Sequence, residues 1–226
     1  LQLTDQQLQG VEITGERSDA NVTNPEMSVT KVTIKEVEKI PVIFGETDVM
    51  KTIQLLPGVK SEGDGGAGFF VRGGSADQNL ILLDEAPVYN ASHMMGFFSV
   101  FNSDALKDVK LYKGGMPAEY GGRLSSVMDI KMKEGNSKSY HVNGGIGIIA
   151  SKLSVEGPIV KDKGSFIVSG RRTYADVFLK LSPNEMQQNS SLYFYDLNLK
   201  ANYQVSENDR IYLSGYLGRD RFGFDN

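Results

Sequence analysis

The sequence contains no cysteine and only two histidines among its 226 residues. The absence of thiols excludes disulfide bridges and thiolate metal sites. The two histidines, His93 and His141, are too few for most zinc sites and for most histidine-based catalytic sites. We therefore predict that the protein is not an enzyme, with no catalytic residues, no metal site and no cofactor.

The sequence also lacks any run of about 20 apolar residues, the length that a membrane-spanning helix needs. Its first residues, LQLTDQQLQG, have neither the basic nor the apolar region of a signal peptide. Strands that cross a membrane hide their apolar residues by alternation, so this absence does not exclude a barrel. An excess of positive charge is missing too, because 24 Lys and Arg face 28 Asp and Glu. That balance argues against a nucleic-acid partner.

What the sequence does have is three stretches of different character. Residues 1–29 form a polar, extended leader that also resembles the end of an upstream domain, residues 30–135 mix helix and strand signals, and residues 136–226 carry strand signals alone. Glycine, with 25 residues, is in excess. Both ends of the chain are expected to be cut from a longer protein.

The middle stretch predicts a small α+β domain. Val49, Ile53 and Leu56 follow each other at helical spacing, with Thr47 or Asp48 able to cap the start and Pro57 ending the pattern. Apolar runs between glycine-rich turns predict strands around this helix. These runs are Phe69–Val71, Leu80–Leu83, Val109–Tyr112 and Val127–Met132.

The last stretch alternates between apolar and polar residues. Tyr195, Leu197, Leu199, Ala201 and Tyr203 are separated by Asp196, Asn198, Lys200 and Asn202. This alternation fits both a soluble sandwich and a membrane barrel. Tyrosines at both ends of the apolar stripe favour the barrel, because aromatic residues gather at the two bilayer interfaces.

Connection lengths support the same choice. The turns at 160–165 and 205–210 are short and polar, whereas 178–192 is a long loop, and this asymmetry is typical of outer-membrane barrels. Strands are predicted at 139–148, 151–159, 165–175, 192–205 and 209–222. Because so few strands cannot close a barrel, the isolated excerpt is expected to swap strands, oligomerise or be partly disordered beyond Gly135.

Four segments within residues 36–133 resemble, in order and spacing, the plug domain of TonB-dependent receptors. They are TDVMKTIQLLPGV, FFVRGG, NLILLDEAPVY and LKDVKLYKGGMPAEYGGRLSSVMDIK. The next segment, SVEGPIVKDKGSFIVSGRRTYAD, resembles the second and third barrel strands of that family. The resemblance implies a small mixed-sheet plug domain with short helices, followed by antiparallel β-strands of an incomplete transmembrane β-barrel.

The resemblance also implies a function. Such a receptor is an active transporter of the Gram-negative outer membrane, whose plug lies in the barrel lumen and gates import of a siderophore, cobalamin or glycan. The implied partners are TonB with ExbB and ExbD in the inner membrane, outer membrane lipid, a nutrient ligand and, in one version of the hypothesis, a surface lipoprotein. Two alternatives remain open: a signal-transducing or surface-assembly receptor of the same fold, and a soluble β-rich binding module.

Site residues follow from the same resemblance. Arg72 and Arg123 match plug arginines that meet acidic groups of the barrel wall, with Glu119 and Asp84 as alternative partners inside the domain. A TonB box, which a partner sheet could pair through its backbone, is implied in the periplasmic leader at Val11, Glu12, Ile13 and Thr14. Plug loops facing the substrate are implied at Ser75, Asp77, Gln78, Tyr89, Asn90, His93, Met94 and Met95.

Overall fold

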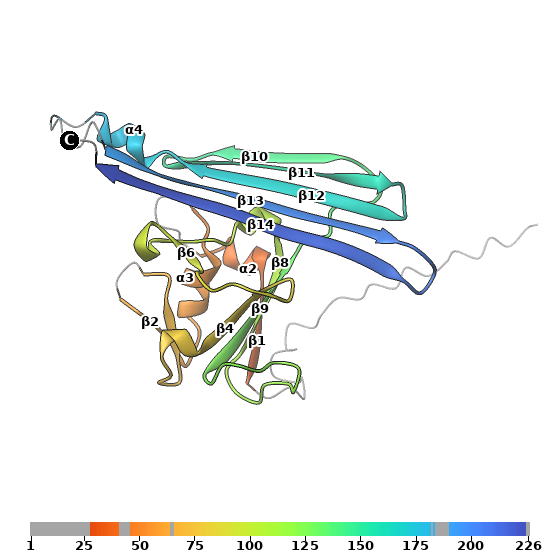
Figure 1. The fold of residues 1–226 in the computed structure, drawn as a ribbon, viewed down its shortest axis with the longest axis horizontal. Coiled ribbons are helices and arrows are strands. Elements are labelled where there is room, and N and C mark those ends of the chain that lie inside the picture. Colours follow the sequence, from red (N-terminus) through yellow and green to blue (C-terminus); the bar gives the residue numbers. More distant parts are fainter. Residues whose placement is uncertain (1–27, 41–45, 64–65, 182, 184–189, 225–226) are drawn as a thin grey trace, which may run out of the picture.

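The structure is a computed structural model that describes residues 28–40, 46–63, 66–181, 183 and 190–224. A globular unit, within residues 28–133, lies against one face of an antiparallel sheet formed by residues 141–224 (Figure 1). The predicted TonB box falls outside the described residues.

The globular unit is built on a mixed sheet with the strand order β1-β8-β9-β4-β5. Strands β4 and β9 are parallel, and the other neighbours are antiparallel. The strands are β1 (Val29–Thr33), β4 (Asn79–Leu83), β5 (Ala86–Pro87), β8 (Leu106–Tyr112) and β9 (Ser126–Met132). The unit also has two two-stranded ribbons. One pairs β2 (Val59–Ser61) with β3 (Phe69–Val71), and the other pairs β6 (Ser92–His93) with β7 (Phe98–Ser99). Single 3-10 turns are η2 (Ala76–Gln78), η3 (Met94–Gly96) and η4 (Ser103–Ala105).

Helix α3 (Val49–Gln54) confirms the predicted amphipathic helix. Asp48 caps its start, because the Oδ1 atom of Asp48 accepts a hydrogen bond of 2.8 Å from the backbone N–H of Met50. Helix α2 (Ile34–Val37) is not predicted from the sequence, although Thr33 and Glu36 form a capping box at its start. The apolar residues of α2 continue the pattern of β1, so periodicity alone does not separate the helix from the strand.

The core of the globular unit lies between its sheet and the two helices. Val37 and Ile53 from the helices and Val109, Leu111 and Ile130 from the sheet are all completely buried. This buried cluster comes from the globular unit, with Tyr216 of the second sheet packed at its border. Among the described residues no helix is both long enough and apolar enough to cross a membrane.

The second sheet has the order β10-β11-β12-β13-β14, and every pairing is antiparallel. Its strands confirm the five that the alternation predicts, with ends that differ by a few residues. They are β10 (His141–Ile146), β11 (Ala150–Val160), β12 (Gly164–Thr173), β13 (Ser190–Gln204) and β14 (Arg210–Phe224). Within the long connection after β12 the chain forms a helix, α4 (Ala175–Leu179). We call this end of the sheet the long-loop end, and the end with the β11–β12 and β13–β14 turns the short-turn end.

The two faces of this sheet differ sharply in polarity. Asp196 and Asn198 of β13 are each only 2% exposed, whereas Leu197 between them is 41% exposed. The polar side chains therefore point to the globular unit, on what we call the inner face, and the apolar ones lie on the free outer face. This arrangement is the opposite of a soluble sandwich, where the apolar face would be buried.

Candidate functional site

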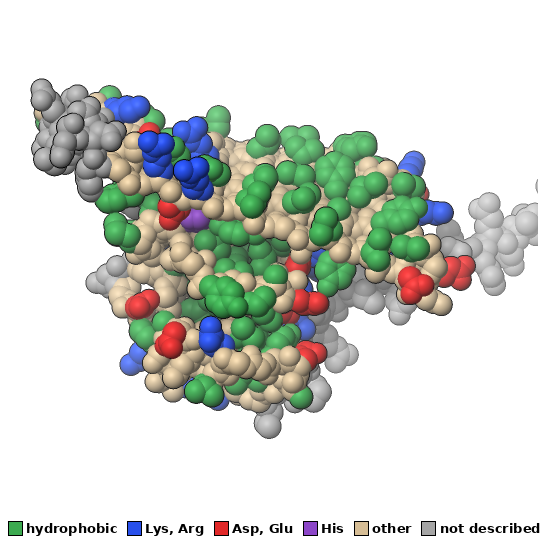
Figure 2. Space-filling model, in the orientation of Figure 1, with side chains coloured by type: hydrophobic (Ala, Val, Ile, Leu, Met, Phe, Trp, Pro, Cys, Tyr) green, Lys and Arg blue, Asp and Glu red, His purple; other side chains and the backbone are tan. Residues whose placement is uncertain are grey.

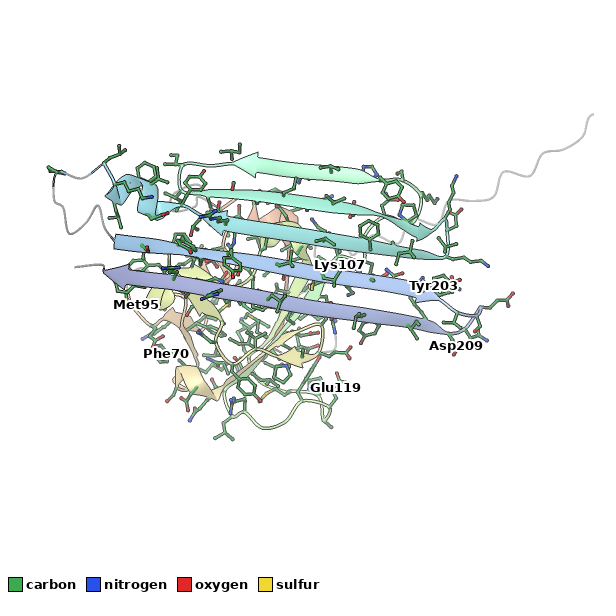
Figure 3. The ribbon with its side chains drawn as sticks, turned by 45° about the horizontal axis from the view of Figure 1, so that its top comes forward. Phe70, Met95, Lys107, Glu119, Tyr203 and Asp209 are labelled. Carbon is green, nitrogen blue, oxygen red and sulfur yellow. The ribbon has the colours of Figure 1, made fainter. Side chains whose placement is uncertain are left out.

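The globular unit has a cavity of about 440 Å³ at the long-loop end. Its floor comes from Met50 and Phe69, and its rim comes from Glu62 and the β6–β7 ribbon. Figure 3 shows Met95, on this rim, at the opposite end of the molecule from Asp209 in the β13–β14 turn. We call this space the loop cavity; Ser92, Met95 and Phe97 are among the ribbon residues that line it.

The rim of the loop cavity has an unusual backbone. Met94, Met95 and Gly96 have φ angles of 51°, 56° and 102°. A left-handed conformation in a non-glycine residue costs roughly 1–3 kcal/mol, so neighbouring contacts must hold it in place. One result is that the Met95 side chain is 84% exposed beside the cavity.

His93, the residue before this strained turn, attaches the rim to the second sheet. Its Nε2 atom lies 2.5 Å from Oδ1 of Asp196, and its Nδ1 atom contacts Oδ1 of Asp220. The Tyr216 hydroxyl donates to the same oxygen of Asp196 at 2.8 Å, and the backbone N–H of Met94 donates to Asp220 Oδ2 at 3.1 Å. Both ring nitrogens of His93 therefore contact carboxylates of the second sheet.

Arg171 of β12 completes this cluster on the inner face. Its guanidinium donates to Oδ2 of Asp196 at 2.9 and 2.5 Å and to the backbone oxygen of Ser99 at 2.7 Å. The ring of Phe194 stacks on His93 with centroids 4.2 Å apart and also lies 5.0 Å from the Arg171 guanidinium carbon. Asp196 is thus a fully buried acid shared by the Arg171 guanidinium and the His93 imidazole, one from each unit.

A second contact lies further along the inner face. The Nζ atom of Lys200 donates to Asp84 Oδ1 at 3.0 Å and to the backbone oxygen of Met132 at 3.3 Å. Asp84 sits in the β4–β5 turn with a φ of 46°, and the same Oδ1 accepts a bond of 3.0 Å from the Met132 N–H. Next to it, the Tyr212 hydroxyl donates to Glu85 at 3.0 Å. Asp84 therefore pairs with the sheet, and no ion pair joins it to Arg72 or Arg123 within the described residues.

A third contact joins η4 of the globular unit to β11 and β12. Lys152 Nζ lies 2.8 Å from Oδ1 of Asp104, and Asn102 donates to the Ser169 hydroxyl at 2.9 Å. Toward the short-turn end, Ser165 and Asn202 donate to the backbone oxygen of Glu134. Contacts between the two units therefore extend along the inner face from one end to the other.

Acids of the globular unit respond to this environment. Burial raises the pKa of Glu46 above its usual value, and the nearby Arg171, 3.9 Å away, opposes that rise. The Tyr212 hydrogen bond and then Lys131 lower the pKa of the exposed Glu85. Glu85 is therefore poised to be ionised, whereas Glu46 resists ionisation.

The predicted substrate-facing residues separate into two groups. Ser75, Asp77, Tyr89, Asn90 and Met95 are exposed, with Gln78 and Met94 partly buried. His93, in contrast, is buried between the ribbon and the sheet, with 4% of its surface exposed. Its burial follows from the contacts with Asp196 and Asp220. The sequence shows only a single histidine in a loop and does not indicate these partners.

The two predicted gating arginines lie elsewhere on the globular unit. Arg72 donates to the Ser28 hydroxyl at 3.0 Å, and Arg123 contacts the backbone oxygen of Gly122. Both are exposed, and within the described part of the chain neither forms an ion pair with β10–β14. Two ion pairs between the units have the opposite arrangement, since Lys200 and Lys152 of the sheet meet Asp84 and Asp104 of the globular unit.

Sequence reasoning missed the residues that make these contacts. Arg171, Asp196 and Lys200 all occupy polar positions of alternating strands. A charged residue repeated on the wet side of a strand is the signal that could have singled them out, because a lumen-facing charge needs a partner.

Residues 21–126 match the family model described as TonB-dependent Receptor Plug Domain. Similar solved structures include the siderophore receptor PirA from Acinetobacter baumannii, with a TM-score of 0.63, 16% identity, and coverage of 87% of this chain and 32% of that one. The ferric enterobactin receptor PfeA from Pseudomonas aeruginosa matches with a TM-score of 0.62 and 17% identity, over 86% of this chain and 33% of that one. The outer membrane transporter YddB from Escherichia coli matches with a TM-score of 0.58 and 15% identity, over 83% of this chain and 32% of that one.

Residues 21–126 are thus a TonB-dependent receptor plug domain by this match, and the chain as a whole, with its adjoining antiparallel strands, shares the fold of these solved receptors. Proteins of this class are receptors and transporters rather than enzymes, as the sequence predicts. The chain spans about a third of the length of the structures it matches. From here on the globular unit is called the plug.

Proposed function

We propose that the receptor imports a scarce nutrient across the outer membrane, with this plug blocking the lumen until TonB pulls on the leader. The observation that carries the proposal is the inner face of β11–β14, whose charged and amide side chains are buried against the plug. Polar contacts of this kind fix the position of the plug without a large apolar interface, so it can be displaced and returned. We expect Arg72 and Arg123 to contact acidic groups in parts of the barrel wall beyond these strands.

The loop cavity is our candidate for the first substrate contact. It lies at the long-loop end, beside the exposed Tyr89, Met95 and Phe97. Among its described lining residues the sole ionisable side chain is Glu62, and no cation is present. A strongly anionic iron chelate would meet the Glu62 carboxylate and no cationic side chain of this lining, since the neighbouring Lys51 donates to the backbone oxygen of Gly66 at 2.7 Å. The cavity therefore favours a neutral or cationic nutrient over an anionic one.

Contact with the inner-membrane machinery is assigned to Val11, Glu12, Ile13 and Thr14. An extended segment with free backbone groups can add as a strand to a TonB sheet, and ExbB and ExbD would supply the energy. Ile13→Pro removes one backbone N–H and should abolish uptake while leaving substrate binding intact. Asp19→Pro, outside the box but in the same leader, is the matched control.

Uptake by a deletion strain carrying the complete gene tests the proposal. The strain is offered neutral and anionic iron chelates, cobalamin and oligosaccharides, each labelled. We expect TonB-dependent uptake of one of these, lost in Ile13→Pro and kept in Asp19→Pro. Uptake of none of them, or uptake equal in a strain without TonB, would reject active import.

A cross-linking experiment then asks whether the plug must move. Because the chain has no native cysteine, Asn102→Cys with Ser169→Cys introduces the only thiols of the sequence shown. A short thiol-reactive linker between them should stop uptake while preserving binding, because the plug stays attached to β12. Either single cysteine variant treated with the same reagent serves as the control.

A further inference from the structure

The outer face of the second sheet carries charge in one place only. By the strand register, its charged residues within the described parts of β10–β14 are Arg172, Arg219 and Arg221. All three are exposed and lie at the long-loop end. No acidic residue shares this face within the described parts of those strands.

The register places the three arginines around two tyrosines. Tyr195 of β13 is paired with Arg172 on one side and Arg219 on the other, and Tyr193 is paired with Arg221. From standard strand spacings, Arg172 and Arg219 are about 10 Å apart across the sheet, and Arg219 and Arg221 about 7 Å apart along β14. The Arg172 guanidinium carbon lies 5.2 Å from the centre of the Tyr193 ring, a cation–π contact that holds it over the sheet.

An apolar band begins directly next to this cluster. Leu197 and Leu217 follow Tyr195 and Arg219 toward the short-turn end, and the band continues to Tyr203 and Ile211. From Leu217 to Ile211 it extends for about 20 Å along β14, which is part of the band of about 25 Å that a membrane barrel presents to lipid. Figure 2 shows Lys and Arg side chains gathered toward the long-loop end of the sheet, with hydrophobic side chains spread along the sheet between its two ends.

The position of the cluster relative to the band identifies the environment of the arginines. An arginine at the bilayer midplane of a barrel costs about 2–4 kcal/mol, but near the interface the cost falls to about 0–1 kcal/mol. Tyrosines are enriched at the same depth. The three guanidinium groups therefore lie at headgroup height when the band lies in hydrocarbon, a placement that rests on the proposed function.

We propose that Arg172, Arg219 and Arg221 bind the phosphate groups of a multiply phosphorylated lipid in the leaflet at the long-loop end. Guanidinium groups form paired, charge-assisted hydrogen bonds with phosphate oxygens, and arginine keeps its charge at any physiological pH. Their separation of about 7–10 Å suits a headgroup that carries more than one phosphate. The acyl chains of the same lipid cover Leu197 and Leu217, so one molecule satisfies both the charge and the apolar surface.

Lipid titration of the purified receptor, expressed from its complete gene, tests the site. The probes are a six-chain disaccharide lipid with two phosphates, the same lipid after enzymatic removal of both phosphates, and inorganic pyrophosphate. Bound lipid is counted by native mass spectrometry. We compare Arg219→Gln/Arg221→Gln with Lys161→Gln/Lys163→Gln, which removes the same charge from the exposed turn at the short-turn end.

The expected result is preferential binding of the phosphorylated lipid, weakened about tenfold or more by Arg219→Gln/Arg221→Gln. The Lys161→Gln/Lys163→Gln control should bind like the wild type, and Arg219→Lys/Arg221→Lys should recover part of the loss. Equal binding of both lipids, or a full-strength complex in Arg219→Gln/Arg221→Gln, would overturn the proposal. Pyrophosphate binding as tight as that of the lipid would replace it with a free-anion site.

The two proposals fail separately. Lipid binding is counted on purified receptor and needs neither TonB nor a transported nutrient. A receptor that binds the phosphorylated lipid but imports nothing refutes the transport proposal alone. A receptor that imports a nutrient but does not distinguish the two lipids refutes the lipid site alone.

Discussion

His93 Nε2 lies 2.5 Å from Oδ1 of Asp196, so the ribbon that borders the loop cavity is attached directly to the second sheet. Ser92 and Met95, on either side of this attachment, line the cavity. The strained turn at Met94 and Met95 joins the two. A ligand that moves Met95 would therefore act on the His93 contact within two residues of backbone.

Asp196→Asn should release this ribbon. Removing one partner of a buried ion pair typically costs about 3–5 kcal/mol, and here it leaves both Arg171 and His93 without their shared acid. We expect amide hydrogens of residues 93–99 to exchange at least ten times faster, measured by mass spectrometry on the receptor. Glu207→Gln, in the exposed turn of the same hairpin, should leave exchange unchanged. Equal protection in both variants would show that Asp196 does not hold the ribbon.

The Lys200–Asp84 pair should show strong coupling. Lys200→Met leaves Asp84, which is buried, without a cation, whereas Lys200→Met with Asp84→Asn removes both charges. We expect the single variant to loosen the plug by about 3–5 kcal/mol and the double variant to recover much of that loss. Urea-dependent protease cleavage of the plug measures both.

Lys107→Met removes a charge from an exposed position of β8 and serves as the control for the Lys200 series. Its protease sensitivity should match that of the wild type. Additive effects of Lys200→Met and Asp84→Asn would contradict a direct pairing.

The sequence predicts the elements of this protein better than it predicts their contacts. The spacing of Val49 and Ile53 locates α3, and the alternation from Tyr195 to Tyr203 gives both the strand and its two faces. Local order of this kind depends on neighbouring residues alone. Pairs such as His93 with Asp196 and Asp84 with Lys200 join residues that are 103 and 116 positions apart, which periodicity cannot reach.

Stability of the plug should depend on pH through Asp129 of β9. Burial raises the pKa of Asp129 above its usual 3.8, and Lys131, 3.5 Å away, opposes the rise. The folded plug thus holds this proton more tightly than the unfolded chain does. As pH rises from 3.8 through the raised pKa, the free energy of unfolding falls.

Asp129→Asn removes the part of this pH dependence that Asp129 contributes. Urea unfolding of residues 28–135, which contain almost all of the plug core, should show a smaller loss of stability over that pH window than the wild type. Glu119→Gln, an exposed carboxylate, should keep the wild-type slope. A slope that survives in Asp129→Asn would assign the effect to another acid.

Gly135 limits how closely the plug and β12 can approach, at the junction of the two units. Its φ is 79°, and a Cβ atom there would lie 2.3 Å from the backbone oxygen of Phe166. Gly135→Ala must therefore strain the junction in two ways, and because a backbone oxygen cannot rotate away, β12 has to move. We expect a loss of about 1–3 kcal/mol or more in docking.

That loss should appear as faster amide exchange at residues 164–168 of the receptor, the part of β12 that faces the junction. Gly121→Ala is a matched control, since no atom lies within 4 Å of the added Cβ and its φ is not in the left-handed region. It should leave exchange at β12 unchanged. If Gly135→Ala also left amide exchange at β12 unchanged, the junction could shift without cost. The contacts of Glu134 with Ser165 and Asn202 would then contribute little to docking of the plug.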